Sequence, residues 1–172
     1  MSINTLQKSK KLRPIRAVVV KAEQETSDTW TLHLFVSDED KDYQAGQFIS
    51  IAPQQFPELR DFTKYFEYQK GKKEQVRAYS LTSAPHEKYL AITIKPEAYE
   101  ALPHSYPPLL SPLLASNGLV GREIEILGYT GAYVIPQDLG SLDHVVHLCA
   151  GSGIVPNFSI LKEAIHSKKK LT

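Results

Sequence analysis

Residues 76–81 place a cation, a phenol and a hydroxyl group inside a short apolar stretch that is typical of a strand. Because successive strand residues face opposite sides, Arg77 and Tyr79 would share one face of this strand. Ala78 and Ser80 would share the other face. A guanidinium two residues from a phenol ring offers an anion clamp beside a flat stacking surface. The pattern predicts a site for a ligand with phosphate at one end and a planar ring at the other, with an ordinary edge strand as the simpler alternative.

A second element suited to anions follows later in the chain. Ser111 before Pro112 is typical of a helix N-cap and first helical residue, and Asn117-Gly118 is a helix stop. The sequence therefore predicts a short helix of about two turns that starts at Ser111. A helix N-terminus presents free N–H groups and the positive end of the helix dipole, which favour an anion. A connector helix without a ligand remains the alternative.

A third pattern occupies the last part of the sequence. Residues 144–149 form a compact apolar run that predicts a buried strand, and we expect Cys149 to be a buried packing residue. Residues 150–156 form a tight glycine turn. Apolar side chains then recur at helical spacing, at Phe158, Leu161, Ala164 and Ile165. Strand, Gly-x-Gly turn and helix make the first half of a nucleotide-binding βαβ unit, which cannot build a parallel sheet without its returning strands.

The elements that must position these motifs read as short strands separated by turn residues. We expect strands over residues 16–22, 29–36, 46–51, 76–81, 89–95 and 122–127, the last continuing through a bend to 134. Residues 76–81 and 89–95 should pair as an antiparallel hairpin. The 54–75 connection is long and rich in aromatic and charged residues, with room for a short helix at 59–62.

The predicted fold is mainly β. It is a six-stranded antiparallel Greek-key barrel with one short helix, followed by a truncated βα start of a parallel α/β nucleotide-binding domain. We expect three parts: a flexible N-terminus at 1–12, the barrel domain at 13–139 and the first βα unit of the incomplete second domain at 140–172.

Composition narrows the function classes. The 172 residues carry a formal net charge of +1, which disfavours nucleic acid as a partner. The single cysteine excludes a disulfide framework and a cysteine-ligated iron–sulfur cluster, and the six histidines lack metal-site spacing, so we expect no metal. No apolar run approaches the ~20 residues of a membrane span. The predicted location is cytoplasmic.

The motif at Arg77-Ala78-Tyr79-Ser80, the Ser111 helix and the glycine turn at 151–156 stand in an order and spacing that resemble the ferredoxin–NADP reductase superfamily. The resemblance runs from about Arg13 to the last residue. In that family an antiparallel barrel binds flavin, and a following parallel-sheet domain binds NAD(P)H. The resemblance therefore implies FAD as the cofactor and NADH or NADPH as the electron donor.

The resemblance also implies roles for residues in the first two motifs. Arg77 would bind the flavin phosphate, Tyr79 would pack on the isoalloxazine or ribityl group, and Ser80 would donate or accept a hydrogen bond near flavin N5. Tyr79 and Ser80 are thus the predicted catalytic residues, and Ala78 belongs to the same cofactor motif.

Three further segments match cofactor-binding segments of the family. The strand end at Ile94-Lys95 would line the flavin site with its backbone. Leu109, Leu110 and Ser111 match the pyrophosphate segment, where the family's glycine is replaced by Pro108, which has no N–H to donate. The nicotinamide nucleotide would lie against the glycine turn, at Gly151, Ser152, Gly153 and Pro156.

The implied activity is hydride transfer from NAD(P)H to FAD, followed by electron transfer to a protein acceptor, namely a ferredoxin, a flavodoxin or an oxygenase component. Alone, the chain is expected to oxidise NAD(P)H poorly, since most of the nucleotide site would lie beyond Thr172. A flavin-free barrel that serves as an interaction subunit is the main alternative. An oligonucleotide-binding barrel fits less well, because the charge is near neutral and no basic, aromatic face is evident.

Overall fold

The computed structural model describes residues 13–100, 106–135 and 144–167. The N-terminal segment 1–12, for which we predicted flexibility, lies outside these ranges, as does the predicted domain boundary at 139. The strands are β1 (Arg13–Thr26), β2 (Thr29–Phe35), β3 (Phe48–Ile51), β4 (Arg77–Ser80), β5 (Leu90–Ile94) and β6 (Glu123–Thr130). The helices are α1 (Arg60–Lys70), α2 (Leu110–Leu114) and α3 (Ile154–His166), with short 3-10 turns between them.

The six strands form one antiparallel sheet in the order β4-β3-β6-β1-β2-β5. The mainly-β, six-stranded antiparallel prediction is confirmed. The sheet curls until its two edges meet, but it is not closed by a ladder. Leu81 and Ile92 form an isolated bridge, and the Thr82 N–H donates to the Ala91 carbonyl at 2.7 Å. The hairpin expected between residues 76–81 and 89–95 is reduced to this meeting point, because β4 pairs along its length with β3 instead.

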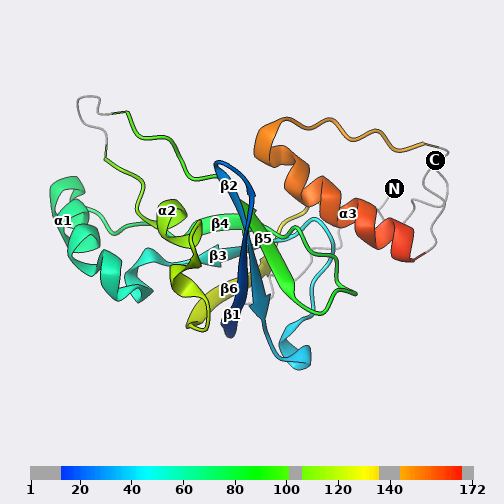
Figure 1. Ribbon diagram of the computed structural model, residues 1–172, viewed down its shortest axis with the longest axis horizontal. Helices are drawn as coiled ribbons and strands as arrows, with labels where there is room; N and C mark the ends of the chain where they lie inside the picture. The colour runs from blue at the N-terminus through cyan, green and yellow to red at the C-terminus, as the bar shows by residue number, and fades with distance from the viewer. Residues whose placement is uncertain (1–12, 101–105, 136–143, 168–172) are drawn as a thin grey trace, which may run out of the picture.

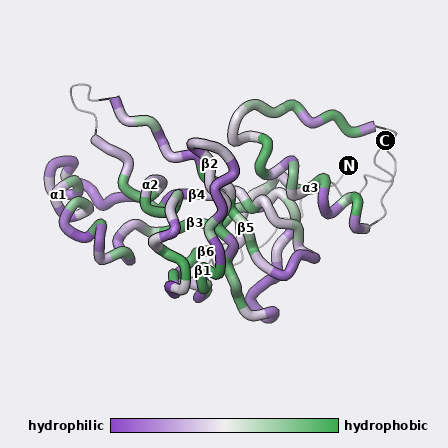
Figure 2. The backbone as a smooth tube through the Cα atoms, viewed as in Figure 1, coloured by the Kyte–Doolittle hydropathy of each residue, from purple (hydrophilic) through white to green (hydrophobic). Residues whose placement is uncertain are grey.

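The core lies inside the curled sheet. Strand residues alternate between core and solvent, so that in β1 the side chains of Ile15, Ala17 and Val19 are buried while Arg16 is exposed. Figure 2 shows the resulting hydrophobic bands along the strands. Fully buried aliphatic residues from five strands fill the interior, including Leu32, Leu34, Ile49, Ile51, Leu90, Ile92 and Ile126. Each contributes roughly 1.5–3 kcal/mol of burial free energy, which makes this core the main stabilising feature of the chain.

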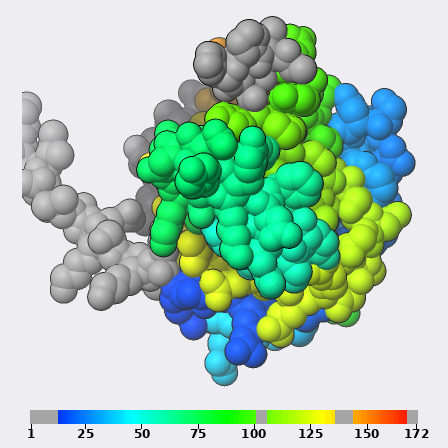
Figure 3. All heavy atoms as spheres, turned by 90° about the vertical axis from the view of Figure 1, so that its left-hand side faces the viewer, coloured from blue at the N-terminus to red at the C-terminus, as the bar shows by residue number. Residues whose placement is uncertain are grey.

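The barrel carries two helices, not the single short helix predicted. The connection between β3 and β4 contains α1, 11 residues long, which ends at Gly71 in the left-handed conformation (φ 64°). Thr63 and Phe66 form its buried face, while Phe62, Tyr65 and Tyr68 are exposed. The helix is longer than the short one considered at 59–62. The sequence underestimates its length because exposed aromatic residues obscure the amphipathic pattern. Figure 3 faces this end of the molecule and shows α1 on the surface beside the segment that contains α2.

The α2 helix is shorter and starts earlier than predicted. It spans five residues, and Leu109 rather than Ser111 occupies the N-cap position. Ser111 is already inside the helix, and its hydroxyl accepts a hydrogen bond from the Glu97 N–H at 3.3 Å. The predicted capping role of Ser111 is therefore wrong. The Asn117-Gly118 stop belongs to a separate 3-10 turn (Asn117–Leu119), whose cap is Ser116.

The predicted strand at 144–149 does not form. The segment is extended but lies outside the sheet, and Figure 1 shows it passing over α3, away from the strands. Cys149 is exposed, so its predicted burial is also wrong. The physical reason is that a buried parallel strand needs neighbouring strands, and no strand within the described ranges pairs with this one.

The predicted helix after the glycine turn is confirmed as α3, but its orientation differs from the predicted one. Ala164 is buried as expected, and so are Val155, Ser159 and Ile160. Phe158, Leu161 and Ile165, which we expected on the buried face, are exposed. The side of α3 that contacts the barrel therefore mixes small and polar residues with two aliphatic ones.

Candidate functional site

Strand β4 places Arg77 and Tyr79 in the wall of one pocket, of about 90 Å³. The opposite wall is the segment that leads into α2, and a third side comes from α1. The pocket is lined by Pro53, Phe66, Lys70, Glu74, Arg77, Tyr79, Glu97, Tyr106, Pro107, Pro108, Leu109, Leu110 and Ser111. The fold thus brings the first and second predicted motifs together, although some thirty residues separate them in sequence.

A carboxylate inside this pocket binds both of its cations. The Arg77 guanidinium lies 3.5 Å from a carboxylate oxygen of Glu74 and donates to the Gln75 carbonyl at 3.3 Å. Lys70 forms an ion pair with the same Glu74 side chain, which is only 7% exposed. The Arg77 side chain is 48% exposed, so its guanidinium remains accessible to a ligand. The geometry suits an anion that approaches from solvent.

Tyr79 adds a neutral ring to this charged pocket. Its side chain is half-buried, and burial raises the pKa of the phenol to about 12, with the negative charge of Glu97 as a smaller cause in the same direction. The phenol therefore stays protonated at neutral pH and can donate a hydrogen bond. Its ring packs against the barrel core on one side.

The other predicted flavin-site residues do not line this pocket. Ala78 is exposed and Ser80 half-buried, and in the ladder between β3 and β4 they lie opposite Ser50 and Phe48. The Ile94 side chain is buried in the core. Lys95 lies just after β5 and forms an ion pair with Asp28 at 2.6 Å. The hydrogen bond from Lys95 is the main cause of the lowered pKa of the Asp28 carboxyl.

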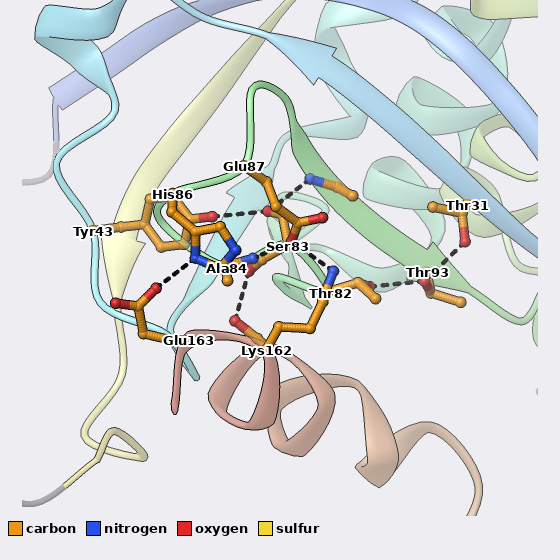
Figure 4. Close-up of polar contacts among 12 residues, drawn as sticks. Thr31, Tyr43, Thr82, Ser83, Ala84, His86, Glu87, Thr93, Lys162 and Glu163 are labelled. Carbon is orange, nitrogen blue, oxygen red and sulfur yellow. Dashed lines mark hydrogen bonds and ion pairs between the residues drawn. The ribbon is translucent and has the colours of Figure 1, made fainter. Parts of the chain in front are cut away.

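A second depression lies at the opposite end of the molecule, between the start of α3 and the outer face of β2 and β5. Its volume is about 370 Å³, and Ile154, Val155 and Phe158 of α3 line one side. Three threonines line the other and form a hydroxyl chain. Thr93 contacts Thr82 at 2.7 Å and Thr31 at 2.9 Å, as Figure 4 shows. We refer to this depression as the threonine groove.

The predicted nicotinamide-binding residues lead into the threonine groove. Gly151, Ser152 and Gly153 form an exposed 3-10 turn directly before Ile154. Pro156 is half-buried in the first turn of α3.

The loop at residues 83–87 fixes α3 against the barrel. The Ser159 hydroxyl donates to the Ser83 carbonyl at 2.6 Å, in a buried position. Lys162 pairs with Glu87 at 2.6 Å, and Figure 4 shows this pair beside the contact between His86 and Glu163 at 2.9 Å. The His86 ring also stacks on His166, with centroids 3.8 Å apart. The glycine turn is therefore anchored to the barrel through the helix that follows it.

Sequence reasoning missed Lys70, Glu74 and Tyr106 in the pocket. Lys70 and Glu74 fall in the 54–75 connection, and Tyr106 falls in the proline-rich stretch before α2. A usable signal was present, since Thr63, Phe66 and Lys70 follow one another at spacings of three and four residues, which places them along one side of a helix. Reading that spacing would have predicted α1 and its inward-facing lysine.

The described ranges hold neither a cluster of metal ligands nor a candidate membrane-spanning helix. No three His, Cys, Asp or Glu side chains converge there on a possible metal site. Among the helices described, none has both the length and the apolar character needed to cross a bilayer.

The likeness to known proteins agrees with this architecture. No protein-family model matches the chain. Flavohemoprotein B of Dictyostelium discoideum is 33% identical over 90 residues, which are 52% of this chain and 20% of that protein. The structure of the ferredoxin-NADP+ reductase of Plasmodium falciparum has a TM-score of 0.67 at 19% identity. The match covers 92% of this chain and 55% of that one. A ferredoxin NADP+ reductase from Neisseria gonorrhoeae, solved with bound FAD and NADP, has a TM-score of 0.63 at 23% identity, over 91% of this chain and 53% of that one.

These likenesses define the class of fold. The chain shares a mainly-β fold, in which a curled antiparallel sheet is followed by a glycine turn and a helix, with these reductase structures. More particularly, the chain has the fold of the ferredoxin–NADP reductase superfamily, and the resemblance seen in its motifs is confirmed at that level. The chain spans about a fifth of the length of the curated relative and just over half of the solved structures.

Proposed function

We propose that this chain is the flavin-binding portion of an NAD(P)H-dependent flavoprotein reductase that passes electrons through FAD to a protein acceptor. The observation that carries the proposal is the convergence of Arg77, Tyr79 and Leu109–Ser111 on one pocket. An accessible guanidinium, a protonated phenol and a ring surface are the groups that a phosphorylated, planar cofactor requires.

The residues divide the binding between them. The Arg77 guanidinium would bind a flavin phosphate through paired N–H donors, and the Tyr79 ring would pack on the isoalloxazine or ribityl group. The backbone of the segment at Leu109, Leu110 and Ser111 would contact the pyrophosphate. The Ile94-Lys95 strand end would contact the flavin through its own backbone.

The catalytic part of the proposal concerns Ser80 and the glycine turn. The flavin, when bound, supplies the change from two-electron to one-electron transfer. Ser80 would form a hydrogen bond near N5. Gly151, Ser152, Gly153 and Pro156 would hold the nicotinamide nucleotide against the threonine groove, because α3 fixes this turn next to the barrel.

The acceptor and the donor belong to the same proposal. We expect NADH or NADPH as the donor, and a ferredoxin, a flavodoxin or an oxygenase component as the acceptor, in the cytoplasm. The names of the similar reductases support this class of partner.

Reconstitution tests the proposal directly. The purified chain is mixed with FAD, freed of excess ligand and examined by visible absorption. We expect the wild type and Arg60→Ala, a control on the exposed side of α1, to retain the flavin, while Arg77→Ala loses most of it. A wild-type protein that stays colourless with added FAD would contradict the proposal and favour the interaction-subunit alternative. Equal retention by Arg77→Ala would refute the phosphate assignment.

A further inference from the structure

Lys70 faces the same pocket as Arg77, from the inner side of α1. Its ammonium lies 4.7 Å from the centroid of the Tyr106 ring and 5.3 Å from that of Phe66, and it pairs with Glu74. The side chain is 24% exposed, so the ammonium is held in a defined position but remains open to solvent on one side. Cation–π contact and the shared carboxylate both restrict a side chain that is otherwise flexible.

The opposite wall of the pocket lacks backbone donors at two of its positions. Pro107 and Pro108 have no N–H, and the Ser111 hydroxyl, which accepts from the Glu97 N–H, has a single O–H left to donate. The α2 helix that follows is only five residues long. A ligand with two phosphates would therefore gain from further donors on charged side chains elsewhere in the pocket.

We infer that Lys70 is a second phosphate-binding residue, and that α1 adapts the pocket to a diphosphate. Arg77 would bind one phosphate of the flavin and Lys70 the next. The inference rests on the proposed function and deepens it, because it predicts a preference for the dinucleotide FAD over the mononucleotide FMN. Glu74 is a positioning residue in this arrangement, since it holds both cations on the same side of the pocket.

The pairing with Glu74 does not remove Lys70 from use. One ammonium has three N–H donors, and one carboxylate shared by two cations leaves a net positive charge on the three groups. The exposed carboxylate of Glu97 is a fourth group in the lining, and it influences Tyr79. The side of the pocket between Lys70 and Arg77 is thus the positively charged one.

Flavin titrations test the inference with binding as the readout. Dissociation constants for FAD, FMN and NADH are measured by absorption or fluorescence for the wild type, Lys70→Met, Lys70→Arg and Lys64→Met. Lys64 is the matched control, an exposed lysine on the outer side of the same helix. Thermal unfolding of each variant shows whether the fold is retained.

We expect Lys70→Met to weaken FAD binding about 10- to 100-fold, the effect of removing one charged hydrogen bond, and to change FMN binding much less. Lys70→Arg should restore most of the FAD affinity, and Lys64→Met should bind both flavins as the wild type does. Unchanged FAD binding by Lys70→Met, equal losses for FAD and FMN, or a loss confined to NADH would each overturn the inference. A wild-type protein that binds neither flavin would refute the proposed function itself. The wild-type titration therefore precedes the comparison of the variants.

Discussion

The pocket beside α1 and the contact beneath α3 both contain ion pairs, but the partners in those pairs lie at very different distances along the chain. In the pocket, Glu74 pairs with Lys70 and Arg77, four and three residues away. Beneath α3, Ser159, Lys162 and Glu163 contact barrel residues 75 to 77 positions earlier. The charge cluster of Lys70, Glu74 and Arg77 can form within its own segment, whereas a docked helix depends on a few long-range contacts and can detach while the sheet stays folded.

The largest expected effect is a loss of unfolding free energy when glycine is replaced by alanine. It is compared between Gly46, near α3, and Gly71, at the end of α1. Gly46 has a φ of +96°, and a Cβ there would lie 2.0 Å from the Tyr133 carbonyl oxygen. Gly71, at the end of α1, has a φ of +64° but nothing within 4 Å of a Cβ. Gly46→Ala should therefore cost about 3 kcal/mol of unfolding free energy, from backbone strain and overpacking together. Gly71→Ala should cost about 1 kcal/mol, from strain alone.

Urea unfolding of the two glycine variants measures this difference. Equal costs would mean that the turn at Gly46 can move away from residue 133. In that case the α3 end would be as adaptable as the α1 end.

The next largest effect is expected from removing the buried hydrogen bond between Ser159 and Ser83 beneath α3. Ser159→Ala removes the donor to the Ser83 carbonyl and should cost about 1.5 kcal/mol, because a buried acceptor loses its partner. Ser167→Ala, an exposed change at the end of the same helix, should stay within about 0.5 kcal/mol of the wild type. Amide hydrogen exchange should show faster exchange in α3 for Ser159→Ala, with β1 and β2 unchanged. If exchange rises equally in the strands, the helix and the sheet unfold as one unit.

The smallest effect is the pH dependence of the same contact. Burial alone would raise the pKa of the Glu87 carboxyl, but hydrogen bonds from Lys162 and the Ala84 N–H outweigh it and lower the pKa from 4.5. Because the folded pKa lies below the unfolded one, the contact is stabilised by Glu87 above about pH 4.5 and loses that stabilisation as the pH falls through the folded value.

Hydrogen exchange of α3 between pH 6 and pH 3.5, corrected for intrinsic rates, should therefore show loosening in acid. In Glu87→Gln, this part of the pH dependence should disappear. A variant that loosens in acid as much as the wild type would show that Glu87 is not the cause of the loosening.

The sequence predicted best where local pattern and tertiary environment coincide. The strands at 29–36, 46–51 and 89–95 were placed within two residues, since alternation reports directly which side chains face the core. β1 is longer than predicted, because β2 and β6 pair with it beyond its apolar centre. The prediction of a strand at 144–149 was wrong because local pattern and tertiary environment differ there. Its apolar run would need neighbouring strands, and the described ranges contain none beside it. The residues chosen for the flavin site keep roles that remain predictions, although the fold brings Arg77, Tyr79 and the α2 segment into one pocket.

The single bridge between Leu81 and Ile92 has a mechanical consequence. A barrel closed by a full ladder resists shear between its strands, whereas here β4 is held along one side only, by β3. The bridge lies just beyond one end of β4, and Arg77 lies at the other, roughly 13 Å away at about 3.3 Å per residue. Because β4 pairs with β3 as far as Arg77 and Ile51, the two strands would shift together at this seam, and Arg77 would move with them. A ligand held between Arg77 and the segment before α2, as proposed, would limit that shift.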